Sequence, residues 1–349
     1  MKVDYIKATT ASEIQSAMRE YDVLVSNSSV RKWCAPGLAT EIGTHSSATS
    51  ILGEVPYLLD EARREPAKAF YEERLAGIEA EFPEWFDGNH KLGILNTRPK
   101  AEVLSFSPAD QTVTIQAGMR VRKLNRILAD VGQCIPVPEC DLKRTTLIST
   151  IQSLGSIDSM IYLDLPHILE SQCGSWRDWV LGMKLVLPNG EVVTAGSKVV
   201  KNVAGFDLHK LMIGSFGTLG VIAEVTLRTF PLQNLPKPEV QIFDRMPNEA
   251  GGVRDMYTWV QRTALSDVSS AIEATKPFVR EVDACTGTLW GLAPFEIEVP
   301  KLPGAWMMCS RAANRNVQID NSTQIALMRR TKQIFDPTNK LNPGVFGFI

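Results

Sequence analysis

The residues best suited to chemistry lie between positions 199 and 222, in the segment VVKNVAGFDLHKLMIGSFGTLGVI. Gly214, Gly217 and Gly220 recur at every third position, with Ser215 and Thr218 between them. Because glycine takes positive φ without strain, such a loop can place backbone N–H groups against a phosphate, a ribose or a planar heterocycle. A connection whose glycines only form turns would show the same pattern, so both interpretations stay open.

Two regular elements must position this loop. Asp207 is a candidate N-cap for a short helix over 208–213, and Gly214 suits the position just past a helix end. Apolar side chains then alternate with the others from Val221 to Leu227, which predicts a half-buried strand. The glycine loop is therefore expected to join a helix to a strand.

The rest of the chain predicts a mixture of helices and strands. Thr10 and Glu13 have capping-box spacing before an apolar helical face, and 23–25 is a short strand. Pro188-Asn189-Gly190 predicts a turn between two strands of a hairpin. Four prolines within 231–249 indicate a domain boundary, and a helix with apolar residues at helical spacing is expected near 327–335.

Composition excludes several classes of protein. With 349 residues, 44% of them hydrophobic, the chain can bury a large core and is expected to form two domains. A net charge of −2 without a basic stripe argues against nucleic-acid binding. We expect no transmembrane segment and no secretory signal, hence a cytoplasmic protein. The six cysteines show no CxxC spacing and are expected to be reduced thiols.

The segment KNVAGFDLHKLMIGSFGTLGVI resembles the flavin-contacting signature of FAD-linked oxidases of the vanillyl-alcohol-oxidase/PCMH type. The resemblance is closest to the E-type subunit of glycolate oxidase. It extends upstream to 103–137 and 174–196, and the stretch ALMRRTKQIFDPTNKLNPGVF at 326–346 resembles the way these proteins end. Residues 1–33 share it loosely.

The resemblance implies an α+β fold. A PCMH-type FAD-binding domain of two α+β subdomains would cover 1–232. A smaller α/β cap domain over 233–322 would define the substrate pocket, and a C-terminal helix and tail over 323–349 would return to the flavin site. Residues 37–95 have no counterpart in the family, so they are expected to form a helical insertion on the outside.

The resemblance also implies FAD as a noncovalent cofactor. No GxGxxG offers a Rossmann site, and no segment resembles those that carry a histidine for covalent flavin attachment. Asn342 matches the asparagine of the family's LNPG ending, although it could equally cap a turn before Pro343. The residues expected at the cofactor are Ser26, Asn27, Ser28, Ser29, Lys201, Gly205, Gly214, Ser215, Gly217, Thr218, Gly220, Val221, Ile222 and Asn342.

Two loops depart from the family pattern. Relatives carry a glycine triplet where this chain has Ser26-Asn27-Ser28-Ser29, so Cβ atoms stand where backbone would approach the pyrophosphate. Relatives carry Thr-Leu-Gly-Gly where this chain has Thr146-Leu147-Ile148-Ser149, and β-branched Ile148 disfavours positive φ. These differences keep a second hypothesis open: a structural or regulatory subunit of a dehydrogenase complex that has lost its flavin.

For the flavoprotein, the resemblance implies oxidation of a small 2-hydroxy acid, with hydride passing to the flavin and the hydroxyl proton to a base. His209 is the candidate base, and a surface or capping histidine is the simpler alternative. Lys201 could balance phosphate charge or could be an ordinary solvated lysine. No metal site is expected. A companion dehydrogenase or iron–sulfur subunit is the expected partner.

Overall fold

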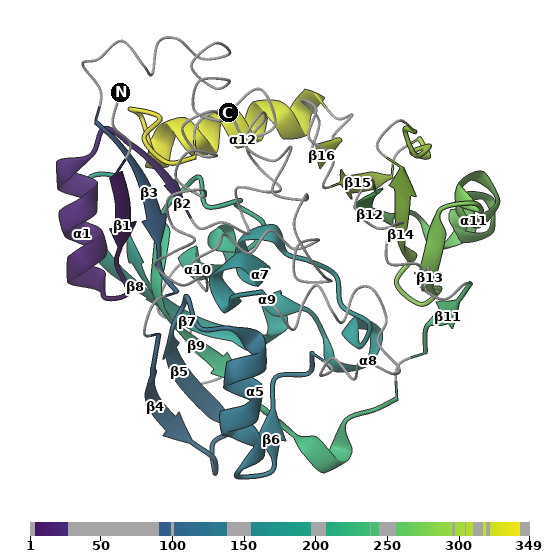
Figure 1. Cartoon of the computed structure of the whole chain (residues 1–349), viewed down its shortest axis with the longest axis horizontal. Helices are drawn as coiled ribbons and strands as arrows, with labels where there is room; N and C mark the ends of the chain where they lie inside the picture. The colour runs from purple at the N-terminus through teal and green to yellow at the C-terminus, as the bar shows by residue number, and fades with distance from the viewer. Residues whose placement is uncertain are drawn as a thin grey trace, which may run out of the picture.

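The computed structural model shows three larger sheets and one two-stranded sheet, with helices packed between and around them (Figure 1). It describes residues 4–26, 91–98, 101–137, 155–196, 207–237, 239–243, 256–294, 297–303, 305–309, 317–318 and 322–342.

The first sheet has three parallel strands in the order β1 (Asp4–Lys7), β3 (Leu92–Asn96) and β2 (Val23–Ser26). Helix α1 (Ala11–Glu20) connects the outer two. It begins with the predicted capping box, in which the Thr10 hydroxyl accepts from the Glu13 amide and the Glu13 carboxylate accepts from the Thr10 amide. Its buried face, Ile14, Ala17 and Met18, packs in a cluster that includes Leu24 and Val221, so the first sheet and the next share a core.

The second sheet has five antiparallel strands in the order β4 (Val103–Ser107), β5 (Thr112–Gln116), β9 (Val221–Arg228), β7 (Val180–Val186) and β8 (Val192–Gly196). β7 and β8 form the hairpin that Pro188-Asn189-Gly190 predicts, with Gly190 at φ 84°. The short strands β6 (Gln133–Cys134) and β10 (Phe230–Pro231) pair beside it.

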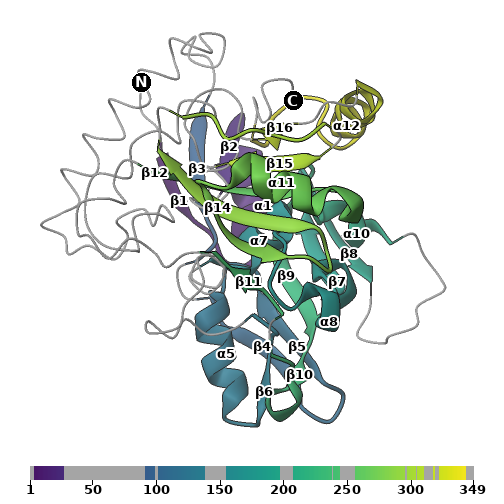
Figure 2. The same cartoon turned by 90° about the vertical axis from the view of Figure 1, so that its right-hand side faces the viewer.

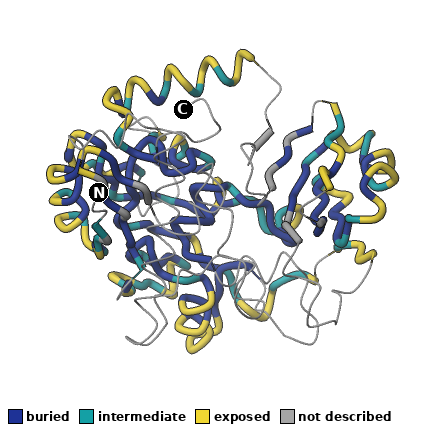
Figure 3. The backbone as a smooth tube through the Cα atoms, turned by 45° about the horizontal axis from the view of Figure 1, so that its top comes forward, coloured by how far each residue is buried: buried dark blue, intermediate teal, exposed yellow. Residues whose placement is uncertain are grey.

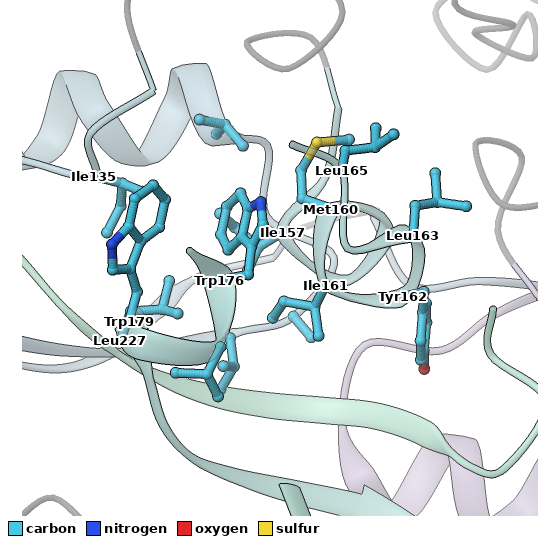
Figure 4. Packing of buried hydrophobic residues seen from close by; sticks show 14 of the residues in the cluster. Ile135, Ile157, Met160, Ile161, Tyr162, Leu163, Leu165, Trp176, Trp179 and Leu227 are labelled. Carbon is cyan, nitrogen blue, oxygen red and sulfur yellow. The ribbon is translucent and has the colours of Figure 1, made fainter. Parts of the chain in front are cut away.

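Helices cover one face of this second sheet. They are α5 (Val121–Ala129), α7 (Ile157–Leu163), α8 (Glu170–Cys173), α9 (Trp176–Trp179) and α10 (Leu208–Met212). Figure 4 shows α7 and α9 pointing Ile161, Trp176 and Trp179 into the largest core cluster. Every residue of α7 is buried, so this helix lies inside the molecule.

The third sheet is antiparallel, in the order β11 (Gln241–Ile242), β13 (Val279–Asp283), β14 (Thr288–Pro294), β12 (Met256–Arg262), β15 (Trp306–Cys309) and β16 (Val317–Gln318). Helix α11 (Val268–Thr275) covers one face of this sheet. Two short 3-10 helices lie elsewhere along the chain, at Leu232–Asn234 before the sheet and at Leu265–Asp267 before α11. On the other face, Trp290 and Leu292 join the largest cluster. Figure 2 shows this sheet beside α7 and α8.

The last helix, α12 (Ser322–Phe335), lies across the top of the molecule from the third sheet toward the first (Figure 1). Figure 3 shows that most of its length is exposed. Lys332 is its only buried residue within 322–335. A tail then leads to Leu341, which forms a parallel bridge with Leu24 at the edge of β2.

The predicted α+β class is confirmed, as are the capping box and the hairpin. The predicted insertion at 37–95 lies almost wholly outside the described residues, and the predicted domain limits stay a prediction. Within the part of the chain that the structure describes, no helix is both long and apolar enough to cross a membrane.

Candidate functional site

The glycine loop runs between α10 and β9, as predicted. Gly214, Phe216 and Gly217 have φ values of 77°, 55° and 68°. The two glycines adopt these angles without strain, whereas Phe216 is a bulky residue in a left-handed conformation that is costly for it. Such a conformation persists only where surrounding contacts impose it, and those contacts come from two sides.

The first side is α7. The amides of Gly214 and Phe216 donate to the carbonyls of Ile161 and Tyr162, at 3.0 and 2.9 Å. The buried Tyr162 hydroxyl donates to the Gly220 carbonyl at 3.1 Å and accepts from the Ile222 amide at 2.7 Å. Burial raises the pKa of Tyr162, so the hydroxyl keeps the proton that the first of these bonds requires.

Arg177 of α9 supports the start of the loop from the same side. Its guanidinium donates to the carbonyls of Lys210 and Ile213 at 3.1 and 2.9 Å, and to Asp164 at 3.3 Å. These are carbonyls at the end of α10, which has no further turn to use them. Arg177 therefore fixes the angle at which the chain leaves the helix.

The second side is the C-terminal tail. The Asn342 side-chain amide donates to the carbonyls of both Phe216 and Gly217, each at 3.0 Å. Its own backbone amide donates to Leu24 of β2 at 3.0 Å. Asn342 thus ties β2 to the glycine loop, and its described contacts are with protein carbonyls.

Lys332 completes this side. Its ammonium donates to the Thr218 carbonyl at 2.9 Å, to the Leu341 carbonyl at 2.6 Å and to Asp336 at 2.6 Å. Burial lowers the pKa of Lys332, while the Asp336 carboxylate opposes that shift. The carboxylate also accepts the amides of Lys340 and Leu341, so both partners of this buried pair are well bonded.

Few of the loop's amides then remain for a ligand. The amides of Ser215 and Thr218 donate to Met212 and Ser215, and the Ser215 and Thr218 hydroxyls donate to the same two carbonyls. By contrast, the amides of Gly217, Leu219 and Gly220 have no hydrogen bond to any of the residues that the structure describes. These three groups are the loop's candidate donors.

His209 does not face the candidate donors. It is buried on α10, and its Nδ1 lies 3.1 Å from where a Cβ on Gly196 would stand, so the ring packs on strand β8. Among the residues that the structure describes, that nitrogen has no hydrogen-bond partner. Burial lowers the pKa of His209, with a smaller effect in the same direction from Lys210, and this favours the neutral ring. Its position is that of a packed histidine.

A buried polar cluster at the start of α7 was not expected from the sequence. Asp158 accepts from the Thr97 hydroxyl at 2.6 Å, from the Ser156 hydroxyl at 2.5 Å and from the Ser159 amide at 2.7 Å. It is 1% exposed. These bonds hold α7 in place and so also the carbonyls that bind the loop. The sequence feature that could have predicted this cluster is the run Ser-Ile-Asp-Ser after Gly155, which is typical of a helix start.

The remaining predicted residues divide by position. Ser26 ends strand β2, and Val221 and Ile222 begin β9. The structure brings Gly214, Ser215, Gly217, Thr218, Gly220 and Asn342 together. The others lie outside the described residues: Asn27, Ser28, Ser29, Lys201 and Gly205.

Arg262 lies where the third sheet meets the helices. It donates to Glu170 of α8 at 2.7 Å and to the Thr288 hydroxyl at 3.1 Å. Its guanidinium therefore already links β12 to α8 and to the neighbouring strand.

Comparison with known proteins gives this geometry a context. Residues 318–346, which include α12 and the tail, match the family described as FAD linked oxidases, C-terminal domain. Over these residues the chain is similar to the FAD-linked oxidases. The glycine loop and the tail, which the sequence predicts to share one site, thus meet in space.

Several curated proteins are similar to parts of this chain. Glycolate oxidase subunit GlcD of Bacillus subtilis is 28% identical over 44% of this chain and 31% of its own length. Glycolate oxidase subunit GlcE of Escherichia coli is 29% identical, over 39% of this chain and 37% of its own length. D-lactate dehydrogenase of Anaerostipes hadrus is 32% identical, over 63% of this chain and 42% of its own length.

This chain therefore spans less than half the length of each of these curated relatives. Among solved structures, alkyldihydroxyacetonephosphate synthase covers 78% of this chain and is covered over 36% of its own length, with a TM-score of 0.40 and 14% identity.

Proposed function

We propose that this chain binds FAD noncovalently and forms the flavin-binding part of an oxidoreductase that acts on a small 2-hydroxy acid. The observation that carries the proposal is the glycine loop, whose amides at Gly217, Leu219 and Gly220 are left unused by the described structure. The relatives named for glycolate oxidase and D-lactate dehydrogenase support the substrate class.

The residues present fit such a cofactor. Two glycines at positive φ present backbone without a side chain, and converging N–H groups bind phosphate oxygens well. Bound FAD would supply the hydride acceptor. The chain's own part is to bind and orient the cofactor. The bonds from α7, Arg177 and the tail hold the loop in its conformation.

The proton acceptor for a hydroxy acid stays unassigned. Burial lowers the pKa of His209, which favours the neutral form that a base requires, but its buried Nδ1 lies against β8. We propose that a companion dehydrogenase or iron–sulfur subunit receives the electrons, in line with the relatives named as glycolate oxidase subunits.

One observation favours the flavin-free alternative. The amides of Gly214, Ser215, Phe216, Thr218 and Ile222 all donate within the chain, so much of the loop's donor capacity serves the fold. A structural subunit that kept the loop as a packing element would need those bonds and no others.

Absorption spectra and thermal unfolding with added FAD test the proposal. Gly217→Ala is the probe, because Gly217 lies in the loop at positive φ and its amide is one of the candidate donors, and Gly132→Ala is its control. Gly132 has nearly the same φ, 69° against 68°, and nothing lies within 4 Å of its missing Cβ. Both variants should bear a similar strain of about 1–2 kcal/mol.

We expect the wild type and Gly132→Ala to show visible flavin bands and to be stabilised by FAD. Gly217→Ala should show neither. A wild-type protein that stays colourless and gains no stability at high FAD concentration would instead favour the structural subunit.

A further inference from the structure

Three successive carbonyls of the glycine loop point toward the C-terminal tail. Asn342 binds those of Phe216 and Gly217, and Lys332 binds that of Thr218. All of these contacts are between 2.9 and 3.0 Å. The described bonds between the tail side and these three loop residues are all accepted by carbonyl oxygens of the loop.

Because these carbonyls are held in place, the direction of the neighbouring N–H groups is also fixed. The peptide unit is planar and trans, so the carbonyl of one residue and the N–H of the next point opposite ways. With the carbonyls of Phe216 and Thr218 held toward the tail, the N–H groups of Gly217 and Leu219 point away from it. These are two of the three amides without a described partner. The third carbonyl, of Gly217, fixes the Thr218 amide, which donates to Ser215.

We propose that Lys332 and Asn342 are positioning residues that aim the amides of Gly217 and Leu219 at the flavin nucleotide without touching it. This inference rests on the proposed function, because it takes the nucleotide as the ligand of those amides. It assigns Asn342 a role through the loop, in place of the direct flavin contact expected from the sequence.

The energetics agree with such a role. A lysine ammonium is costly to bury, yet Lys332 is the one buried residue of α12 within 322–335. The other residues of α12 are exposed or only partly buried, and Phe335, which packs against the largest core cluster, is one of the partly buried ones. Asp336 balances it from one side, while the Thr218 and Leu341 carbonyls accept from it on the others.

The arrangement makes cofactor binding and tail docking depend on each other. If the docked tail raises the affinity of the loop for the nucleotide, the nucleotide must stabilise the docked tail by the same factor. A tail that served only to stabilise the fold would show no such reciprocity.

The test compares two glycine substitutions in the tail. Asn342 and Asn339 both have left-handed backbones, with φ of 44° and 51°, so Asn342→Gly and Asn339→Gly relieve similar strain. Asn342→Gly also removes the side chain that holds the loop, whereas Asn339 is exposed. FAD dissociation constants are measured from the change in flavin absorption, with thermal unfolding of each apoprotein as the check on folding.

We expect Asn342→Gly to weaken FAD binding about tenfold or more, which corresponds to about 1.4 kcal/mol. Asn339→Gly should stay within about twofold of wild type, a difference below about 0.4 kcal/mol. Equal dissociation constants for the two variants, in a protein whose wild type binds FAD, would overturn this inference and leave the proposed function standing. A wild type that binds no FAD would overturn both.

A measurement on the wild type guards against a variant that fails to fold. Amide hydrogen exchange over residues 336–342 should slow when FAD is added, because the bound nucleotide holds the loop that holds the tail. Unchanged exchange in that segment at saturating FAD would contradict the coupling.

Discussion

The two sides that hold the glycine loop differ in what else depends on them. On the α7 side, Tyr162 is 1% exposed and belongs to the largest core cluster. On the tail side, Lys332 and Asn342 reach the loop from a helix that is mostly exposed (Figure 3) and from the short tail that follows it. The α7 side thus gives the loop its fold, and the tail side adjusts a loop that is already folded.

Replacing Tyr162 should have the largest effect. Tyr162→Ala removes a large core side chain and both bonds to the loop, and is expected to cost about 3–5 kcal/mol of unfolding free energy. Tyr162→Phe keeps the ring but leaves the Ile222 amide and the Gly220 carbonyl unpaired, for about 1–3 kcal/mol. Urea unfolding measures both. If Tyr162→Phe were as stable as wild type, the α7 side would not depend on this hydroxyl.

Acid should weaken the α7 side next. His167 is buried after α7 with its ring 4.3 Å from that of Trp179, and burial lowers its pKa to about 3. The unfolded chain takes up this proton near its usual pKa, so stability is full above about pH 6.5 and falls as the pH drops toward 3. The loss is up to about 4 kcal/mol.

The same unfolding series on His167→Gln isolates this contribution. Glutamine cannot take up the proton, so the variant should lose less stability than wild type between pH 6.5 and 3. Parallel stability curves for the two proteins over that range would show that His167 does not titrate in the way proposed.

On the tail side, Lys332→Met should cost less than Tyr162→Ala, about 2–3 kcal/mol, because Asp336 keeps the amides of Lys340 and Leu341. The control is Lys276→Met, which removes an exposed lysine paired with Glu273 and should change stability little. Thermal unfolding compares the two. Equal and negligible effects would mean that the buried pair does not hold the tail.

Local parts of this structure could be read from the sequence. The capping box of Thr10 and Glu13, the hairpin at Gly190 and the turn at Gly214 follow from side chains within a few residues of one another. The positions of the loop glycines also follow, since Gly214 and Gly217 take the positive φ that their residue type allows.

The contacts between segments that are distant in sequence could not be predicted. Phe216 has positive φ because α7 and the tail hold its amide and its carbonyl, and those partners are distant in sequence. Lys332 follows Arg329 and Arg330 in the sequence, and nothing in these neighbours marks it as buried; only the meeting of α12 with the loop buries it. The motif correctly predicted that Asn342 lies beside the glycine loop. In the structure its side-chain amide donates to carbonyls of that loop.

The tail's grip on the loop also sets an order of events during synthesis. Residues near 216 leave the ribosome more than a hundred positions before Lys332 and Asn342 do, so α7 can bind the new loop while the tail does not yet exist. Until translation passes position 342, the bonds from Lys332 and Asn342 to the loop carbonyls cannot form, so the directions of the Gly217 and Leu219 amides are not yet fixed. A nascent chain should therefore capture its nucleotide late, after the earlier sheets have folded.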